Sequence, residues 1–280
     1  MADSGETAKD LRRNIGVSGG NAMTQQADQN ARVLDQFSQQ AKAYAALVNK
    51  ASGGARDPLI EALAATRADK VLDVGCGSGQ FAVAIAAVAG EVLGVDLTPA
   101  MLETARAHQA KAGAANVTWE LADSTALPVA DGAFDIVTGR SMLHHAADPA
   151  ATLAEMRRAC APGGRIAVLD LTPTADKSPA FDAIELLRDP SHARTLTADQ
   201  LRDLGADLGL EELSVQPRAS DLPLEMTLAT SFPGPGVLER VRELYARDAA
   251  SGADIFGLKA RIQDGVVWVT YPMTMVIWRR

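Results

Sequence analysis

Residues 71–79 read VLDVGCGSG and decide the fold. An apolar run that meets closely spaced glycines is typical of a buried strand entering a tight turn, and a helix is expected to follow over residues 79–89. The segment 91–96, EVLGVD, predicts a second buried strand that ends in a carboxylate. Gly75 and Asp96 are 21 residues apart, close to the ~20-residue spacing at which nucleotide-binding α/β folds place an acid beside a ribose hydroxyl. The stretch therefore predicts a nucleotide site.

The glycine spacing argues against one common nucleotide site and excludes another. A dinucleotide-binding turn, G-x-G-x-x-G, would have its third glycine at position 80, where this chain has Gln80. No G-x-x-x-x-G-K-[ST] segment occurs in the sequence, so a P-loop is excluded as well. The order is instead G-x-G-x-G, at Gly75, Gly77 and Gly79, with Asp73 preceding it inside the strand.

This pattern resembles the first motif of the class I S-adenosylmethionine-dependent methyltransferases, in their small-molecule and quinone-type branch (ubiquinone and menaquinone methyltransferase-like). The resemblance covers roughly residues 31–280. Four further segments fall in the family's order: 96–102 (DLTPAML), 122–128 (ADSTALP), 134–145 (FDIVTGRSMLHH) and 161–170 (APGGRIAVLD).

The resemblance implies a cofactor, S-adenosyl-L-methionine, whose product is S-adenosyl-L-homocysteine, and a set of residues that bind it. Asp96 would accept hydrogen bonds from the ribose diol. Leu97 and Met101 would cover the adenine, and the Asp123 side chain would accept from the adenine amino group. The expected cofactor-binding residues are Asp73, Gly75, Cys76, Gly77, Gly79, Asp96, Leu97, Met101, Asp123, Ser124 and Arg140.

Two of these residues have more than one interpretation. An acid inside a buried strand is unfavourable unless it is hydrogen-bonded, and the resemblance suggests that Asp73 supports the glycine loop and reaches the cofactor's amino group through water. Arg140 would bind a cofactor carboxylate or a substrate anion, or would form a surface salt bridge.

Residues 69–171 alternate short strand and helix patterns, which is typical of a parallel sheet with helices on both faces. We expect an α/β fold with a doubly wound, seven-stranded, mostly parallel sheet; the resemblance implies the Rossmann-like methyltransferase fold with an antiparallel last strand. Ligands of such sheets bind outside the carboxyl ends of the strands. The expected strands lie near 70–74, 91–96, 117–121, 134–139, 165–170, 212–219 and 265–278.

The chain is expected to divide into a core and smaller accessory segments. Its first 30 residues are polar without periodicity, which predicts disorder, and Met23 leaves open whether residues 1–22 are native. The expected segments are a disordered leader or tail (1–30), an N-terminal helical lid (31–68), a cofactor-binding α/β core (69–221), a substrate cap (222–264) and a final edge strand of the core (265–280).

Methyl transfer from a sulfonium is an in-line displacement that needs alignment, exclusion of water and, for a poorly acidic acceptor, a base. No metal is expected. The candidate catalytic residues are Tyr44 on the lid helix, where Phe37 also resembles the family's lid pattern, and the histidines His145 and His192. Adjacent residues point in different directions, so we expect His145 rather than His144 to face the pocket; the alternative is a histidine that bonds its own loop.

His192 belongs to the segment Arg188-Asp189-Pro190-Ser191-His192, which resembles an LRDPSH element found in part of the family. One interpretation is a base with its orienting acid. The other is a hydrogen-bonded turn in which Asp189 binds the backbone of Ser191 and His192. The sequence alone leaves both open.

Composition restricts the partners. The chain has 280 residues, a net charge of −8 and 47% hydrophobic residues, and the negative charge argues against a nucleic-acid partner. No apolar run approaches ~20 residues and no signal core is present, so a cytoplasmic protein without a membrane span is expected. Its two cysteines suggest neither a disulfide framework nor a metal site. The expected partner is a small-molecule substrate, and monomer and homodimer both stay open.

The expected function is transfer of a methyl group from S-adenosylmethionine to an O, N or C atom of a small metabolite. An apolar or aromatic metabolite is favoured by aromatic residues in the last third of the chain, although core packing would explain them too. The alternatives are a cofactor-binding protein of the same fold without methyl transfer and a nicotinamide-dependent oxidoreductase, which Gln80 disfavours. The aromatic residues are Phe232, Phe256, Trp268 and Tyr271.

Overall fold

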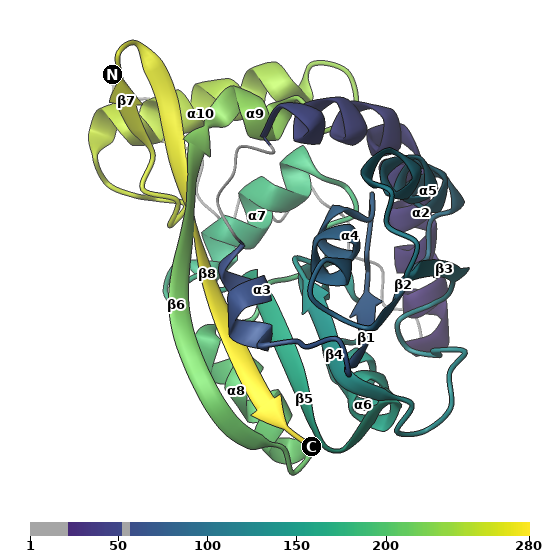
Figure 1. The fold of residues 1–280 in the computed structure, drawn as a ribbon. Helices are drawn as coiled ribbons and strands as arrows, with labels where there is room; N and C mark the ends of the chain where they lie inside the picture. The colour runs from purple at the N-terminus through teal and green to yellow at the C-terminus, as the bar shows by residue number, and fades with distance from the viewer. Residues whose placement is uncertain (1–21, 52–56) are drawn as a thin grey trace, which may run out of the picture.

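A computed structural model describes residues 22–51 and 57–280 of the chain, and a twisted sheet forms its centre (Figure 1). The strands of the described part are β1 (Lys70–Val74), β2 (Glu91–Asp96), β3 (Val117–Leu121), β4 (Phe134–Arg140), β5 (Cys160–Leu171), β6 (Glu211–Pro223), β7 (Arg261–Gln263) and β8 (Val266–Arg279). Their order is β3-β2-β1-β4-β5-β8-β6, and β7 pairs with β8. β1 to β5 are parallel, whereas β8 is antiparallel to β5 and β6. The predicted α/β fold, mostly parallel with an antiparallel last strand, is confirmed.

The predicted number of strands, seven, is one too small for the described part. The additional strand is β7, which lies within the segment expected to be cap. Asp264 and Gly265 both have positive φ angles, 51° and 77°, the backbone that a two-residue hairpin turn requires. Gln263 and Val266 are therefore brought into register at the end of a short hairpin.

Helices cover both faces of the sheet. The helices of the described part are α2 (Ala22–Ala51), α3 (Pro58–Leu63), α4 (Gln80–Ala86), α5 (Pro99–Ala112), α6 (Pro149–Ala159), α7 (Ser178–Arg188), α8 (Ala198–Asp207), α9 (Leu224–Leu228) and α10 (Val237–Ser251). One apolar cluster joins α3 and α4 to the sheet, and another joins α6 and α8 to its opposite face. The strand order reverses between β1 and β4, so the crevice for a ligand is expected at their carboxyl ends.

Helix α2 corrects the expected disorder over residues 1–30, because the structure is helical from Ala22; residues 1–21 lie outside the described part. The buried face of this helix carries the amides Gln29, Gln36 and Gln40, which are 7%, 2% and 4% exposed. These glutamines recur at intervals of seven and four residues, as a helix face requires. The helical lid is expected only from residue 31, because the residue that α2 buries before that point is Gln29, an amide that a search for apolar periodicity does not detect.

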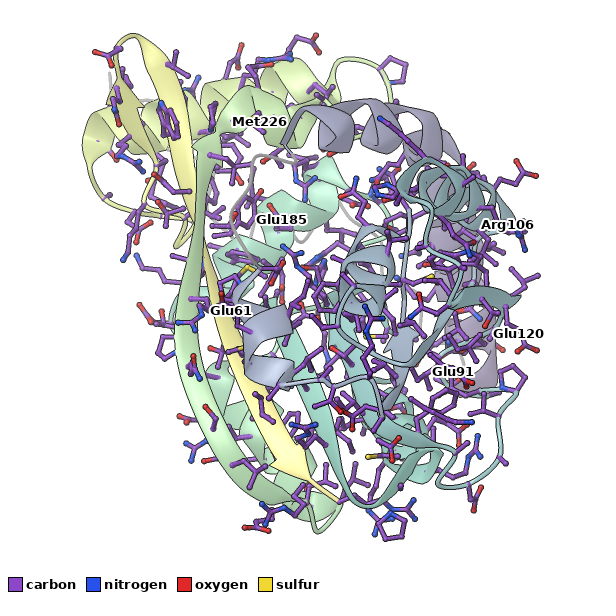
Figure 2. The ribbon with its side chains drawn as sticks, viewed as in Figure 1. Glu61, Glu91, Arg106, Glu120, Glu185 and Met226 are labelled. Carbon is purple, nitrogen blue, oxygen red and sulfur yellow. The ribbon has the colours of Figure 1, made fainter. Side chains whose placement is uncertain are left out.

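The cap is a separate apolar cluster built by α7, α9 and α10 on the upper ends of β6 and β8 (Figure 1). Phe181 of α7 packs edge-on against Tyr271 of β8, with ring centroids 6.2 Å apart. Helix α7 therefore packs with the cap rather than with the core to which its residue number was assigned. Figure 2 shows Glu185 of α7 inside this region, 1% exposed, whereas Glu91 and Glu120 lie on the outer surface.

In the described residues, no helix has the length and apolar character needed to cross a membrane.

Candidate functional site

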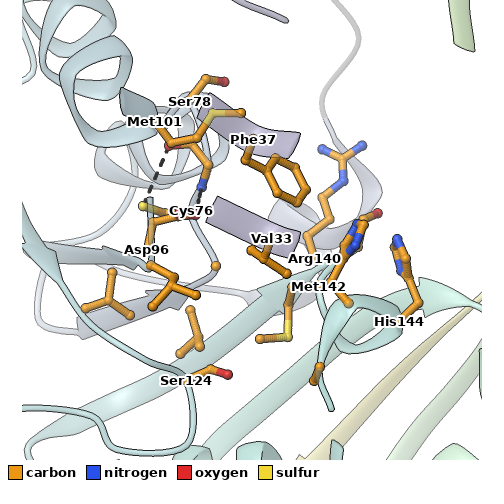
Figure 3. Close-up of a pocket in the computed structure, with 18 of the residues that line it drawn as sticks. Val33, Phe37, Cys76, Ser78, Asp96, Met101, Ser124, Arg140, Met142 and His144 are labelled. Carbon is orange, nitrogen blue, oxygen red and sulfur yellow. Dashed lines mark hydrogen bonds between the residues drawn. The ribbon is translucent and has the colours of Figure 1, made fainter. Parts of the chain in front are cut away.

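A cavity of about 520 Å³ opens at the carboxyl ends of β1, β2 and β4, beneath helix α2 (Figure 3). This volume lies within the ~300–1,000 Å³ range of ligand sites in proteins. Ten of the eleven residues expected to bind the cofactor line the cavity; Gly79 does not. The motifs therefore converge on one site, as the sheet topology predicts.

Gly77 and Gly79 show why the turn needs glycines for two different reasons. Gly79, with φ +74°, begins α4, and a Cβ there would lie 2.5 Å from the Trp119 ring and 2.6 Å from the Ala105 Cβ. Gly77, with φ +51°, lines the cavity, and a Cβ there would meet no atom within 4 Å. Gly79 thus allows close packing of the turn, whereas Gly77 leaves space on the ligand side.

Asp96 connects the glycine turn to the end of β2. Its Oδ2 accepts a hydrogen bond of 2.8 Å from the Gly77 amide, and its Oδ1 accepts one of 2.8 Å from the Thr98 amide. Burial raises the pKa of Asp96 against the effect of these bonds. A carboxylate offers about four lone-pair positions, so two bonds to the backbone leave capacity for a ligand diol.

Asp73 is buried in β1 at 2% exposure and lines the same cavity. Burial raises its pKa to about 8, although Arg140 acts in the opposite direction. Within the described residues its Oδ2 has no hydrogen-bond partner. This oxygen therefore makes no bond to the glycine loop, and the carboxyl group, mainly protonated at neutral pH, faces the cavity.

Asp123, the residue expected to bind the adenine amino group, accepts hydrogen bonds at both of its carboxylate oxygens. Its Oδ1 accepts from the Thr125 amide and hydroxyl at 2.8 and 2.7 Å, and its Oδ2 accepts from the Asn30 side chain at 2.6 Å. Burial alone would raise the pKa of Asp123, but these hydrogen bonds lower it. Asn30 belongs to the segment expected to be disordered, so sequence reasoning missed this contact.

Arg140 forms a salt bridge, as one interpretation of the sequence expected. It also lines the cavity, as expected for a residue that binds an anion of the cofactor or substrate. Its Nη1 lies 2.6 Å from Asp57 Oδ2, and its guanidinium lies 5.8 Å from the centre of the Phe81 ring. Arg140 and Phe81 both line the cavity. An anion at the cavity would therefore compete with Asp57 for this guanidinium.

Both histidines after β4 line the cavity, so the expectation that only one would face it is wrong. His144 Nδ1 is 2.5 Å from Asp170 Oδ1, while Asp170 Oδ2 accepts from the Met142 and Leu143 amides. Burial would lower the pKa of His144, but the charge and hydrogen bond of Asp170 raise it. The two side chains form a buried hydrogen-bonded pair in which the carboxylate favours the charged form of the imidazole.

His145 is held in a single tautomer by the turn that follows α7. Its Nδ1 is 3.1 Å from the Ser191 carbonyl and 3.2 Å from the Ser191 hydroxyl, which donates its own proton to Asp189 Oδ1 at 2.5 Å. Neither Ser191 oxygen can donate to the ring, so Nδ1 carries the proton and Nε2 has the free lone pair. Burial and the neighbouring His144 charge lower the pKa of His145 to about 3. Its imidazole is therefore neutral at physiological pH.

His192, the other expected histidine base, does not line the cavity. It is 2% exposed, and its Nε2 lies 3.0 Å from Asp182 Oδ1. The segment forms the hydrogen-bonded turn: Asp189 Oδ1 accepts from the Ser191 amide, and the Asp189 carbonyl accepts from the His192 amide. The acid of this segment orients His145, which comes from a distant loop, rather than His192.

The lid helix and the cap differ from expectation at their aromatic positions. Phe37 lines the cavity and contacts the edge of the His145 ring at a centroid distance of 5.0 Å. Tyr44 lies in α2, but its side chain is outside the described part. The aromatic residues of the last third do not line the cavity; Phe256 and Tyr271 are buried in the cap core.

Gln29 is a site residue that sequence reasoning missed. Its Nε2 donates to the His145 carbonyl at 2.9 Å and to the Ser191 carbonyl at 2.6 Å. It lies on the buried amide face of α2, next to Asn30. A search for helical periodicity in amides, instead of apolar residues, is the signal that would have found both.

Comparison with known proteins agrees with this geometry. Residues 72–168 match the family model described as a methyltransferase domain. YcgJ of Bacillus subtilis, described as a methyltransferase, is 35% identical over 129 residues, 45% of this chain and 50% of that protein. The ubiquinone biosynthesis O-methyltransferase of Thiobacillus denitrificans is 44% identical over 96 residues, 34% of this chain and 41% of that enzyme. The chain thus spans half or less of the length of these curated relatives.

Solved structures share the fold. The crystal structure of YcgJ superposes with a TM-score of 0.72 at 21% identity, covering 79% of this chain and 96% of that one. The [4+2]-cyclase SpnF superposes with a TM-score of 0.51 at 21% identity, covering 79% of each chain. At these identities the likeness concerns the fold alone. Residues 72–168, which contain the glycine turn, Asp96 and Asp123, are thus similar in sequence to a methyltransferase domain.

Proposed function

We propose that this chain transfers a methyl group from S-adenosylmethionine to an oxygen, nitrogen or carbon atom of a small molecule. The observation that carries the proposal is the meeting of Gly77, Asp96 and Asp123 in one cavity at the point where the strand order reverses. Each has the chemistry that one part of the cofactor requires. A net charge of −8 supports a small-molecule acceptor over a nucleic acid.

The residues present fit this cofactor. Asp96 retains lone pairs for the ribose hydroxyls, and the space beside Gly77 allows close approach of a ligand. Asp73 contributes a buried oxygen without a partner among the described residues, which is suited to a polar group of the amino-acid portion. Leu97 and Met101 supply apolar surface to the cavity.

When bound, S-adenosylmethionine supplies a methyl group made electrophilic by its sulfonium. The chain must then position the acceptor and exclude water. His145 Nε2 can accept a hydrogen bond from the acceptor's O–H or N–H and so direct its lone pair toward the methyl. With a pKa of about 3, this imidazole is a weak base. His145 therefore suits an acceptor that is already acidic, such as a phenol, better than an alkyl hydroxyl.

A second candidate is a cofactor-binding protein that does not transfer a methyl group. It is favoured by the likeness to SpnF, which has the same fold and is described as a cyclase. Both candidate functions require S-adenosylmethionine binding, but only methyl transfer converts it to S-adenosylhomocysteine. A nicotinamide-dependent activity is disfavoured by Gln80 at the position of the third glycine.

The test is calorimetric titration with S-adenosylmethionine, S-adenosylhomocysteine and NAD. We expect micromolar binding of both sulfur nucleotides and none of NAD. Asp96→Asn should weaken this binding, whereas Asp199→Asn, an exposed acid paired with Arg202 away from the cavity, should not. Mass-spectrometric detection of S-adenosylhomocysteine formed with phenols, quinols and amines then separates methyl transfer from binding alone. Absence of binding by either sulfur nucleotide would contradict the proposal.

A further inference from the structure

The end of α7 places an unusual donor beside the cavity. Arg188 lines the cavity, and its side chain is 12% exposed. Its Nη2 lies 2.6 Å from Glu185 Oε2, its Nε 3.4 Å from Glu185 Oε1, and its Nη1 donates to the Ser231 hydroxyl at 2.8 Å. A guanidinium has five N–H donors. Each of the two terminal nitrogens therefore keeps one N–H for which the described residues provide no hydrogen bond.

Glu185, on the side away from the cavity, holds the guanidinium of Arg188 in place. Glu185 is 1% exposed, and its Oε1 also accepts from the Tyr271 hydroxyl at 3.1 Å and lies 3.5 Å from the Tyr245 hydroxyl. Burial opposes the charge of Arg188, but Glu185 holds the pKa of the guanidinium well above its ordinary value. Arg188 thus presents a preoriented charged donor to the cavity.

A hydrogen-bond acceptor, the carboxylate of Asp189, follows this donor in the chain. Asp189 is 4% exposed and lines the cavity. Its Oδ1 receives both hydrogen bonds from Ser191, while its Oδ2 has no hydrogen bond from the described residues. Burial would raise the pKa of Asp189, but the charge of Arg188 and the hydrogen bonds from Ser191 lower it. The carboxylate is therefore ionised at neutral pH.

The charge balance at this end of the cavity disfavours an anionic ligand. Each cation that lines the cavity in the described part already has a carboxylate: Arg188 has Glu185, Arg140 has Asp57 and His144 has Asp170. Asp189 adds a further negative charge, and the neighbouring cation, Arg188, is already paired with Glu185. A carboxylate or phosphate would meet this charge in a buried setting, where like-charge contacts are strongly unfavourable.

Arg188, Asp189 and Phe37 line one end of the cavity, here called the acceptor end. We propose that this end binds a neutral aromatic molecule that carries a hydroxyl group and a carbonyl oxygen on one ring. The hydroxyl donates its one proton to Asp189 Oδ2 rather than to His145 Nε2, because a charged acceptor forms the stronger hydrogen bond, and the carbonyl accepts from Arg188. Phe37 supplies the apolar contact for the ring. This inference rests on the proposed function, because it names the acceptor class of the same site.

The test compares matched probes by calorimetry in the presence of saturating S-adenosylhomocysteine. The probes are 2- and 3-hydroxyacetophenone, the corresponding ethylphenols that lack the carbonyl, acetophenone that lacks the hydroxyl, and 3-hydroxybenzoate that replaces the ketone by an anion. A hydrogen bond to a charged group is worth about one to two powers of ten in affinity. We expect at least one hydroxyacetophenone to bind about tenfold more tightly than its ethylphenol, acetophenone and 3-hydroxybenzoate.

Two variants assign this preference to residues. Arg188→Lys keeps a cation for Glu185, so the protein should fold, but it loses the fork; the preference for the ketone over the ethylphenol should fall to about threefold or less. Asp189→Asn removes this further negative charge and should bring the affinity of 3-hydroxybenzoate close to that of the ketone. Arg242→Lys, in an exposed ion pair with Glu225, is the matched control and should change neither ratio.

The inference is overturned if the wild-type protein binds ethylphenol as tightly as the ketone, if it prefers 3-hydroxybenzoate, or if the preference survives in Arg188→Lys. Binding of S-adenosylhomocysteine is measured first on each protein. Failure at that step contradicts the proposed function, and the probe series is then run without the nucleotide under the same criteria.

Discussion

The two ends of the cavity are built in different ways. The end proposed to hold the cofactor, here the cofactor end, uses backbone amides and side chains that follow consecutive strands, such as Asp96 bound to Gly77 19 residues away. The acceptor end is assembled from distant segments: Gln29 donates to Ser191 across 162 residues, and His145 meets Ser191 across 46. A site made by one turn and its neighbouring strand ends has a local sequence signature. A site made by side chains from separate segments has none until the chain is folded.

The largest expected effect separates folding from binding within the cofactor end. Gly79→Ala should destabilise the protein by about 3 kcal/mol, because it combines a positive φ angle with overlap against Trp119. Gly77→Ala should lower the free energy of unfolding only by the backbone strain, about 1 kcal/mol. It should instead weaken S-adenosylhomocysteine binding. Urea unfolding and calorimetry on both variants check this division. Equal stability of the two variants would show that the turn does not have two separate roles.

Asp73 makes the stability of the cofactor end depend on pH. Its pKa is about 8 in the folded protein and about 4 in the unfolded chain, so the folded state holds an extra proton between these values. Stability is therefore highest below the unfolded pKa and is lost as the pH rises to about 8. Relative to wild type, Asp73→Asn should gain about 2 kcal/mol from pH 6 to 8.

Thermal melts of both proteins at several pH values measure this difference. The gap in melting temperature should widen with pH up to about 8 and then become constant. A constant gap from pH 5 onwards would mean that Asp73 ionises normally in the folded state.

Asp96 and Ser191 test whether the two ends act separately. Asp96→Asn should reduce the affinity for S-adenosylhomocysteine at least about tenfold, because an ionised acceptor forms stronger hydrogen bonds to a diol than an amide does. Ser191→Ala should leave that affinity within about twofold, since Ser191 contacts His145 and Asp189 only at the acceptor end. A comparable loss in both variants, measured by calorimetry, would contradict the separation.

The histidine pair gives a spectroscopic test of the acceptor end. Nitrogen-15 NMR should show His145 neutral and protonated on Nδ1 throughout pH 5–9, because burial and the His144 charge lower its pKa to about 3. Asp170→Asn removes the partner that keeps His144 charged, so the pKa of His145 should rise. Titration of His145 near pH 6.5 in the wild-type protein would disprove this electrostatic account.

The smallest expected effects come from helix α2, which contacts both ends. Asn30→Ala removes a bond to Asp123 and should weaken S-adenosylhomocysteine binding a few-fold, as expected for a partly exposed hydrogen bond worth about 1 kcal/mol. Gln29→Ala removes bonds to the carbonyls of His145 and Ser191 and should alter hydroxyacetophenone affinity instead. Calorimetry with S-adenosylhomocysteine and hydroxyacetophenone measures both affinities for each variant. If both variants lose affinity for the same ligands, α2 acts as one rigid lid.

Much of the fold and of the cofactor end could be predicted because they depend on local rules. The glycine spacing and the acid that ends β2 place Gly77 and Asp96 at neighbouring strand ends. The start of α2, before residue 31, was missed because the residue that it buries there is Gln29, which hydrophobic periodicity ignores. Strand β7 was missed because it has only three residues.

The acceptor end could not be predicted for a different reason. The sequence shows Asp189 two residues before Ser191 and three before His192, so a local partnership with His192 is the natural hypothesis. In the fold, His192 turns toward Asp182, and His145 takes its place beside Ser191. Which histidine a turn will meet depends on how α7 packs against the loop after β4, and no local pattern encodes that contact.

A crystal structure of the complex with S-adenosylhomocysteine tests the central claim most directly. The account predicts both ribose hydroxyls within about 2.5–3.0 Å of the Asp96 carboxylate, the adenine beside Asp123, and the sulfur facing the end of the cavity that holds His145. A nucleotide bound elsewhere, or one whose ribose does not contact Asp96, would contradict the assignment of the two ends of the cavity.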